Sequence, residues 1–312
     1  MPPDPPSSNQ KGPVMQDFYK PFEERKLDFQ YRNRLQHILN KGELAKKTPQ
    51  GVGALTCFGT LPQMVFDPRD GIPLITERNL VSWRSGVAEI LAFINGARTI
   101  DEIESYGVNP AFWSPYRGKG IELGLEPNDM GPGSYGAVFH DYERADGTTL
   151  NQFAQMLDQI RAYPHMRSHR TTNWRPDYIA RGPERKVIVT PCHGKVHVRI
   201  LNGKLHLRMD QDSADFPIGV PHNMIQYAAL HLMICQVLGY EPGNFIHSFS
   251  DAHIYENQVE AVQTMIERGP RFFPALNIDP EVRSLFDFRI EHFSLVRGEY
   301  APHPALKVPY AP

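Results

Sequence analysis

The sequence predicts one α+β domain in which helices cover a mixed β-sheet. Residues 195–201 and 204–210 alternate between apolar and polar side chains around Asn202-Gly203, a pair typical of a tight β-hairpin. Residues 222–239 are mostly apolar and long enough to form a helix in the core of the domain. Because no internal repeat and no convincing linker interrupts the chain, these elements are expected to share one domain.

Local patterns predict the other elements in chain order. Apolar residues at helical spacing predict a helix over residues 24–41 that stops at Gly42. Residues 54–58 are predicted to form a strand, and residues 82–96 a buried helix that holds Glu89. Residues 104–136 are rich in loops. The set is completed by an amphipathic helix over 149–163, an apolar strand over 186–190 and a further helix over about 253–268.

Composition places the chain among ordinary globular proteins. Of its 312 residues, 41% are hydrophobic and 22% are charged, with a net charge of −2. This charge provides no basic field for a phosphate backbone, so no nucleic-acid polymer is expected as a partner. No apolar run approaches the roughly 20 residues that span a bilayer, and the first residues lack a signal-peptide pattern. We therefore expect a cytoplasmic protein without a membrane partner.

The N-terminus and the cysteines refine this expectation. Residues 1–17 are rich in proline and serine and are predicted to be a disordered tail, which leaves residues 18–312 as the folded domain. Three cysteines are an odd and sparse set, which argues against a disulfide framework and for a reducing compartment. Cys57 and Cys235 lie in apolar segments and are predicted to fill the core. Cys192 differs, because it follows a proline and precedes a histidine.

Three residues have the functional groups that a covalent reaction on a flat ring requires. The thiolate of Cys192 can add to an electron-poor ring carbon. A buried acid such as Glu89 can move protons through water. The amide of Asn223 offers one acceptor and two donors to the edge of an amide-like base. Each has a structural alternative, in which Cys192 only packs, Glu89 faces solvent and Asn223 caps a helix. For Asp215 the structural alternative is a residue that closes a turn.

Most of the chain, from about Leu27 to Val308, resembles the thymidylate synthase and pyrimidine-nucleotide C5 hydroxymethylase family. The resemblance is carried by segments in the family's order: residues 55–59, 82–96, 131–136, 191–193, 211–223, 243–255 and 302–304. It implies a thymidylate synthase-like fold and a catalytic domain over residues 18–312. It also implies a transferase that uses 5,10-methylenetetrahydrofolate and acts on a pyrimidine nucleoside or nucleotide.

The resemblance assigns roles to five residues. Cys192 resembles the nucleophile that attacks C6 of the pyrimidine, and Glu89 the glutamate that organises proton transfers through water. Tyr135 resembles the tyrosine that assists proton removal from C5. Asp215 resembles the aspartate that anchors the pterin. Asn223 resembles the amide that reads the O4/N3 edge of uracil, and because relatives that act on cytosine have Asp there, the substrate is expected to carry a uracil ring.

Further binding residues follow from the same resemblance. His253 and Tyr255 resemble the pair that hydrogen-bonds the sugar 3′-hydroxyl. The other residues assigned to the substrate are Ser213, Arg167, Asp212, Gln211 and His222, and those assigned to the folate are Asp215, Phe112, Trp113 and Gly219. No metal is expected. A homodimer is implied, because Arg167 should reach the neighbouring subunit's site.

The chain departs from the family where the nucleotide's 5′-phosphate binds. The family uses four arginines and a serine, but here Pro49, Asp212 and Ser168 align with three of those arginines, and only Arg167 and Ser213 remain. An aspartate beside a dianion replaces a charge-assisted contact by repulsion. Weak or absent phosphate binding is therefore expected. Asp212 is then left to accept a hydrogen bond from a free 5′-hydroxyl or to pair with a cationic group.

A second departure concerns the fate of the transferred carbon. In thymidylate synthases a tryptophan shields the exocyclic methylene, and here either Phe112 or Trp113 stands at that wall. His222 replaces a usual aromatic residue and could order a water, which favours hydroxymethylation. The alternatives are a thymidylate synthase that methylates dUMP and a catalytically silent relative that binds a nucleoside or folate. The sequence leaves open the sugar, the 5′ group, the product and the pathway.

Overall fold

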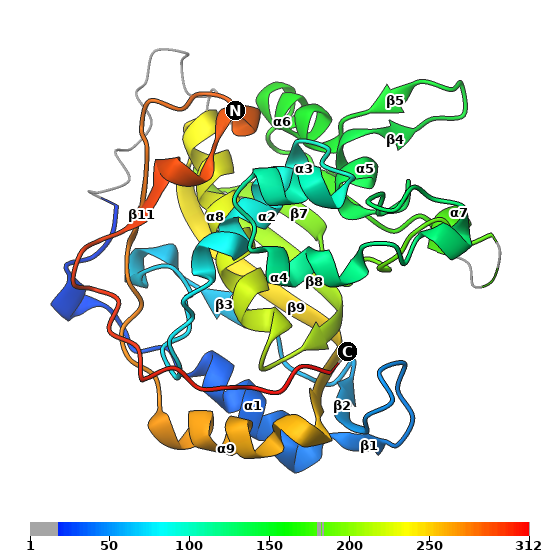
Figure 1. The fold of residues 1–312 in the computed structure, drawn as a ribbon. Coiled ribbons are helices and arrows are strands. Elements are labelled where there is room, and N and C mark those ends of the chain that lie inside the picture. The colour runs from blue at the N-terminus through cyan, green and yellow to red at the C-terminus, as the bar shows by residue number, and fades with distance from the viewer. Residues whose placement is uncertain (1–17, 180–181, 183, 312) are drawn as a thin grey trace.

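A seven-stranded mixed sheet runs through the centre of the protein (Figure 1). The computed structural model describes residues 18–179, 182 and 184–311, so the tail predicted over residues 1–17 lies outside the described residues. The strand order is β1-β2-β9-β8-β7-β6, with β3 paired to β9, and only β8 and β9 run parallel. The strands are β1 (Glu43–Ala45), β2 (Ala54–Phe58), β3 (Met64–Phe66), β6 (Arg170–Thr171), β7 (Lys195–Leu201), β8 (Lys204–Asp215) and β9 (Glu241–Tyr255).

The hairpin between β7 and β8 forms where the sequence predicts it. Leu201 pairs with Lys204, and the two residues between them have positive φ, 51° at Asn202 and 76° at Gly203. This left-handed backbone suits asparagine and glycine and matches the twist of antiparallel strands. The turn therefore fixes the register that carries β8 toward its C-terminal end, where the candidate site lies.

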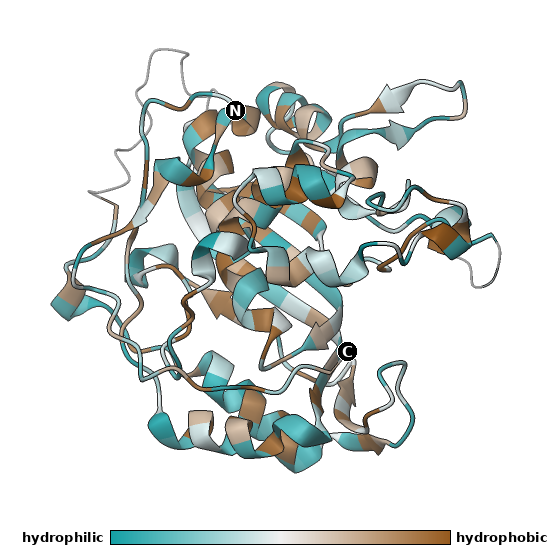
Figure 2. Cartoon of the chain, viewed as in Figure 1, coloured by the Kyte–Doolittle hydropathy of each residue, from teal (hydrophilic) through white to brown (hydrophobic). Residues whose placement is uncertain are grey.

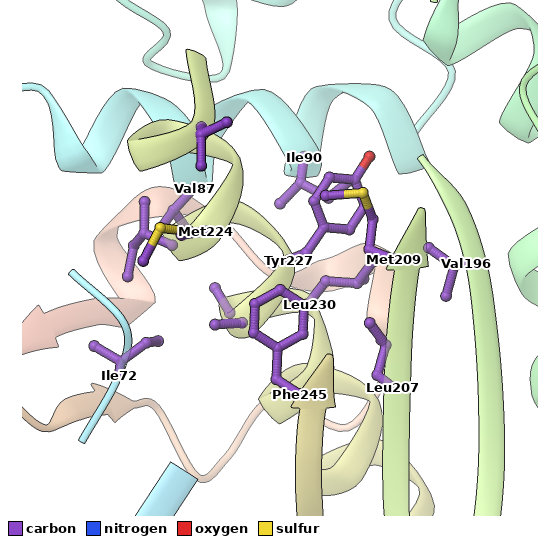
Figure 3. Packing of buried hydrophobic residues seen from close by; sticks show 14 of the residues in the cluster. Ile72, Val87, Ile90, Val196, Leu207, Met209, Met224, Tyr227, Leu230 and Phe245 are labelled. Carbon is purple, nitrogen blue, oxygen red and sulfur yellow. The ribbon is translucent and has the colours of Figure 1, made fainter. Parts of the chain in front are cut away.

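Two buried helices connect the sheet to the rest of the core. Helix α8 (Gly219–Leu238) links the parallel strands β8 and β9, and helix α2 (Trp83–Ile94) packs against α8. Apolar side chains from both helices and from the sheet meet in one cluster; Figure 3 shows Val87, Ile90, Val196, Leu207, Met209, Met224, Tyr227, Leu230 and Phe245 in it. This packing holds the polar residues of α2 and α8 at fixed positions within the domain.

Shorter elements surround this core. Helices α1 and α9 pack together at one end, and Figure 2 shows polar and apolar residues alternating on both, as expected for outer helices. The helices are α1 (Gln30–Lys41), α3 (Ile100–Ser105), α4 (Pro110–Trp113), α5 (Tyr135–His140), α6 (Gln152–Ala162), α7 (Pro176–Ile179) and α9 (Val259–Arg268). Two small antiparallel sheets pair β4 (Tyr142–Glu143) with β5 (Thr149–Leu150) and β10 (Leu276–Ile278) with β11 (Phe293–Leu295).

The far face of the sheet is polar. Along β7, Val196 and Val198 are buried, whereas the alternate residues Lys195, His197 and Arg199 remain partly accessible. This alternation means that α8 and its neighbours cover one face only.

Several predicted boundaries were wrong. The first helix begins at Gln30 instead of residue 24, because the carboxylate of Asp28 accepts the backbone N–H of Gln30 at 2.8 Å and starts the helix there. Residues 186–190 form no strand, because the backbone of this segment bonds to a loop: Ile188 N–H donates to the carbonyl of Met130. Residues 253–255 belong to β9, so the last long helix begins only at Val259.

Two helices also start elsewhere than predicted. Residues Thr149–Leu150 form β5, and α6 begins at Gln152 because the side chain of Asn151 caps it through Ala154 N–H at 2.9 Å. Helix α8 begins at Gly219, so Asn223 lies inside the helix and is not its N-cap. The structure thereby removes the helix-capping alternative for Asn223. Cys57 and Cys235 are buried free cysteines, as predicted.

Candidate active site

The backbone of Cys192 is tied to two elements that meet beside it. Its N–H donates to the hydroxyl of Tyr135, at the start of α5, at 2.7 Å. Its carbonyl accepts from Asp212 N–H at 2.7 Å and from Ser213 N–H at 3.1 Å, both near the end of β8. The thiol is partly accessible and donates to the carbonyl of Thr190 at 3.4 Å. These contacts fix the position of a cysteine that no regular element holds.

The charges around Cys192 favour the neutral thiol in this state. Burial raises the pKa of the thiol, and the negative charge of Asp212 raises it further, whereas hydrogen bonds from Tyr135 and Ser213 lower it. Asp212 is itself paired, because Lys195 on the adjacent strand lies 2.5 Å from its carboxylate oxygen. Lys195 therefore offsets the charge that opposes thiolate formation.

Glu89 lies on the buried face of α2 and accepts two hydrogen bonds. The indole N–H of Trp113 donates to its Oε1 at 2.7 Å, and the amide of Gln226 donates to its Oε2 at 3.2 Å. The side chain is buried, and this burial raises the pKa of Glu89 to about 7, although both hydrogen bonds oppose the rise. A carboxyl group with this pKa can either hold or release a proton near neutral pH. The solvent-facing alternative for Glu89 is wrong.

A chain of side-chain amides continues from Glu89 through the core. Gln226 Oε1 accepts from Asn223 Nδ2 at 2.9 Å, and Asn223 Oδ1 accepts from Gln211 Nε2 at 3.0 Å. Gln211 Nε2 also donates to the carbonyl of Ser213 at 2.9 Å, and its Oε1 lies 2.8 Å from His247 Nε2. The structure thus connects Asn223 to Glu89 through one intervening side chain. All of these side chains except Ser213 are buried.

Aromatic rings surround the ring of Tyr135. Its ring stacks on Phe93 at 4.6 Å and on His193 at 4.7 Å between centroids, and the edge of Trp113 lies 6.4 Å away. Burial raises the pKa of Tyr135 well above its ordinary value, so the phenol stays protonated at neutral pH. Burial also lowers the pKa of His193 to about 3, which keeps this imidazole neutral beside the tyrosine. The environment of the thiol therefore contains no cationic histidine at this position.

His222 uses both ring nitrogens. Nδ1 lies 3.0 Å from the carbonyl of Ile218, which can only accept, so Nδ1 carries the proton. Nε2 then accepts from the hydroxyl of Ser82 at 2.7 Å. Burial lowers the pKa of His222 to about 4, and Phe112 packs edge-on against its ring at 5.0 Å. Phe112 thus contacts His222, whereas Trp113 contacts Glu89.

Asp215 and the sugar-site candidates lie together where β8 and β9 end. Asp215 on β8 lies opposite His253 on β9 in the register of these parallel strands, and its carboxylate accepts from Ile218 N–H at 3.3 Å. Gln258 Nε2 lies 3.3 Å from Asp215 and also donates to the carbonyl of Pro309 at 3.1 Å. Burial raises the pKa of Asp215. The imidazole of His253 lies edge-on to Tyr255, with ring centroids 5.1 Å apart.

Gly219 leaves space between two of these groups. A Cβ at this position would lie 3.8 Å from Asn223 Oδ1 and 3.9 Å from Asp215 Cβ, so a side chain would occupy the region between them. Glycine therefore adds no side chain of its own beside the carboxylate of Asp215. A pterin offers the N–H donors that such a carboxylate accepts, so these residues fit the folate.

Arg167 makes its hydrogen bond away from the residues around Cys192. Its carbonyl accepts from His197 Nε2 at 3.0 Å, on the polar face of the sheet, and its side chain is exposed. Within residues 18–179, 182 and 184–311, the Arg167 guanidinium has no hydrogen bond or ion pair to the residues around Cys192.

Four residues of this site were missed from the sequence: Lys195, Gln226, Gln258 and Ser82. Gln226 gave a usable signal, because a glutamine three residues after Asn223 on a mostly apolar helix must find buried partners. Lys195 gave one as well, because the predicted hairpin sets it opposite Asp210, two residues before Asp212. Ser82 and Gln258 gave none, since their partners come from distant segments.

These contacts bring together a cysteine held by Tyr135, a buried acid with a raised pKa and a chain of buried amides. A family model described as thymidylate synthase matches residues 29–312. The chain belongs to the thymidylate synthase family. The family carries out one-carbon transfer to C5 of pyrimidines with methylenetetrahydrofolate as co-substrate, and it binds pyrimidine nucleotide and folate. In the described part of the chain, no helix is long and apolar enough to cross a membrane.

Proposed function

We propose that this enzyme transfers a one-carbon unit from methylenetetrahydrofolate to C5 of a uracil-type nucleoside or nucleotide, and that the product carries a hydroxymethyl group. The observation that supports this proposal is the buried hydrogen-bond chain from Asn223 through Gln226 to Glu89. Tyr135, which packs beside Trp113, brings that chain next to Cys192. A base-reading amide, a proton carrier and a nucleophile thus belong to one connected group.

The reaction begins when the thiolate of Cys192 adds to C6 of the ring. The electron pair of the C5–C6 double bond moves to C5 and O4, and C5 then forms a bond to the one-carbon unit. The C5 proton leaves, and the bond between the carbon and the folate nitrogen breaks, which leaves an exocyclic methylene on C5. Asn223 accepts from N3–H and donates to O4, so it stabilises the charge that develops on O4.

Tyr135 and Glu89 have separate roles in this scheme. The Tyr135 oxygen accepts the Cys192 N–H, which leaves its own proton to stabilise the thiolate. Because the pKa of Glu89 is raised to about 7, its carboxyl can hold a proton or take one through water during the C5 deprotonation. Trp113 keeps this carboxyl oriented.

The 5′ side of the substrate is proposed to be a free hydroxyl or another group without the charge of a phosphate. Lys195 is paired with Asp212 at 2.5 Å, so its charge is already balanced before substrate arrives. A dianion beside Asp212 would lose the favourable field that the family's arginine provides. In a homodimer, which we also propose, Arg167 would extend from the polar face of one sheet toward the neighbouring subunit.

Water addition is assigned to Ser82 and His222. The Ser82 hydroxyl donates to His222 Nε2, and its oxygen keeps lone pairs that can accept from a water. That water's oxygen bonds to the exocyclic carbon, the electron pair returns to the ring, and the Cys192 thiolate is expelled. One proton of the water stays on the new hydroxymethyl group, and the other passes to this serine–histidine pair.

Methylation is a second candidate, and Trp113 favours it. Its indole is buried, donates to Glu89 and packs beside Tyr135, and these contacts support a role as the aromatic wall that excludes water from the carbon. Methylenetetrahydrofolate supplies the carbon at the oxidation level of a methylene group and, for a methyl product, also the hydride. Asp215, Gly219 and Phe112 are proposed to hold it.

A product assay tests this proposal. The purified protein is incubated with methylenetetrahydrofolate and separately with dUMP, UMP, deoxyuridine and uridine, and products are read by mass spectrometry. A gain of one CH₂O supports hydroxymethylation, and reaction of the nucleoside over the monophosphate supports the assignment of Asp212. A gain of one CH₂ with formation of dihydrofolate selects methylation. No product from any uracil substrate contradicts the proposal.

A further inference from the structure

Gln226 is a fully buried amide in a helix whose neighbouring residues are apolar. It is 0% exposed, and residues 224, 225 and 227–230 around it are buried hydrophobic side chains. Its two amide atoms contact two different parts of the site: Oε1 accepts from Asn223, and Nε2 donates to Glu89. A methionine of similar volume would fill this position without ordering a polar group, so packing alone does not account for the glutamine.

The direction of every hydrogen bond in the chain is fixed from one end. The carbonyl of Ser213 can only accept, so Gln211 must present its Nε2 there, and the second N–H of that group donates to Asn223 Oδ1. Asn223 therefore presents Nδ2 to Gln226 Oε1, and Gln226 presents Nε2 to Glu89. Rotating the Asn223 amide by half a turn would oppose two N–H groups at one end and two oxygens at the other.

Asn223 keeps one free N–H and one free lone pair after these contacts. A uracil edge offers N3–H as donor and O4 as acceptor, which complement the two free positions. A cytosine edge offers the reverse, an acceptor at N3 and a donor at N4. Because the amide cannot turn to match it, cytosine would meet two like groups.

We propose that Gln226 is a positioning and specificity-determining residue. It holds the Asn223 amide in the uracil-reading orientation from one side, as Gln211 does from the other, and it connects this amide to Glu89. This inference rests on the proposed function, since it assumes that Asn223 reads the base. Gln226 touches neither ring nor nucleophile. It acts by excluding the amide orientation that cytosine requires, and by supplying one of the two donors that hold the Glu89 carboxylate.

The test uses the variant Gln226→Met, and the variant Gln236→Met is the matched control. Gln236 lies on the same helix and donates two hydrogen bonds at 2.9 Å to the carbonyls of Asp279 and Val282, away from the site. Both variants lose one amide and its hydrogen bonds. Turnover and calorimetric binding are measured with dUMP, dCMP, deoxyuridine and deoxycytidine. Gln226→Met is expected to lower the uracil-to-cytosine ratio by about tenfold to a hundredfold, and Gln236→Met to leave it unchanged.

A pH profile separates positioning from packing. Loss of the Gln226 donor removes one of the contacts that lower the pKa of Glu89, so the midpoint of the profile near neutral pH should move upward. The other groups that face Glu89 are Trp113, Tyr135 and Tyr227, and none of them titrates near neutral pH, since burial raises the pKa of both tyrosines well above 10. A residue that only fills space would leave this midpoint in place.

Gln226→Glu provides a rescue with a defined pH dependence. A carboxyl at this position still accepts from Asn223, but it donates to Glu89 only while the two carboxyls share one proton. Because the acceptor for Asn223 is present in either protonation state, the uracil preference should be retained across the pH range, whereas turnover should fall as the shared proton, and with it the donor to Glu89, is lost.

The outcomes separate this inference from the proposed function. If the wild type forms no product but binds dUMP better than dCMP, and Gln226→Met removes that preference, the proposed function fails and the inference holds. If Gln226→Met keeps both the wild-type ratio and the wild-type pH midpoint, the inference is overturned even when the enzyme is active. A wild type that binds uracil and cytosine equally also overturns it.

Discussion

Glu89 links the stability of this enzyme to pH in a way that can be measured without knowing its substrate. Burial raises the pKa of this carboxyl from 4.5 to about 7 in the folded protein. The folded state therefore holds a proton that the unfolded chain releases between these two values. The stabilisation is fully present below pH 4.5 and is lost as pH rises through 7. The full effect is about 3 kcal/mol, because the pKa rises from 4.5 to about 7 and each pKa unit corresponds to about 1.4 kcal/mol.

The variant Glu89→Met isolates this contribution. It removes the carboxyl and leaves Trp113 and Gln226 without an acceptor, a cost that does not depend on pH. Subtracting its free energy of unfolding from that of the wild type should give a difference that falls by about 2 to 3 kcal/mol from pH 5 to pH 8.5. Burial keeps the pKa of His193 at about 3 and of His222 at about 4, so these neighbours do not titrate in this window.

Urea unfolding at five pH values between 5 and 8.5 measures this difference. A difference that is constant with pH would show that Glu89 is solvated or permanently ionised, and would refute the argument from burial.

Three further substitutions test other parts of the site. Cys192→Ala should abolish product formation while leaving calorimetric binding of dUMP or deoxyuridine in place; retained turnover would exclude the covalent mechanism. Asp212→Asn frees Lys195, so the affinity for dUMP relative to deoxyuridine should rise by about tenfold, and thiol alkylation of Cys192 should begin at lower pH because a charge that raises its pKa is gone. An unchanged ratio would place the 5′ group elsewhere. Tyr135→Phe removes the acceptor of the Cys192 N–H, so urea unfolding should show a loss of about 1–3 kcal/mol; no loss would mean that water replaces the hydroxyl.

Local patterns predicted those features of the fold that local forces determine. The hairpin at Asn202-Gly203 depends on two adjacent residues with positive φ, and the buried helix around Glu89 depends on its own apolar run. The segment 186–190 was predicted as a strand and is not one, because an apolar run also suits an extended segment that bonds to a loop. Residues 253–255 continue β9, since pairing with β8 and β2 outweighs their helical spacing.

The site shows the same division between local and distant forces. Cys192, Glu89 and Asn223 could be named from residue type and family resemblance, but their connections could not. Gln226 and Glu89 are separated by 137 positions, and only the packing of α8 against α2 brings them together. Lys195 pairs with Asp212 because β7 and β8 are neighbours, a relation that depends on strand register and not on either residue alone.

Release of the C5 hydrogen tests the central claim most directly. Uracil substrates deuterated at C5 (dUMP, UMP, deoxyuridine and uridine) are incubated with methylenetetrahydrofolate and either the wild type or Cys192→Ala. Attack of Cys192 on C6 makes C5 the nucleophile, so the wild type should replace deuterium by the one-carbon unit in at least one substrate, and the variant should release none. Product that keeps its C5 deuterium, or equal release by both proteins, would contradict the account.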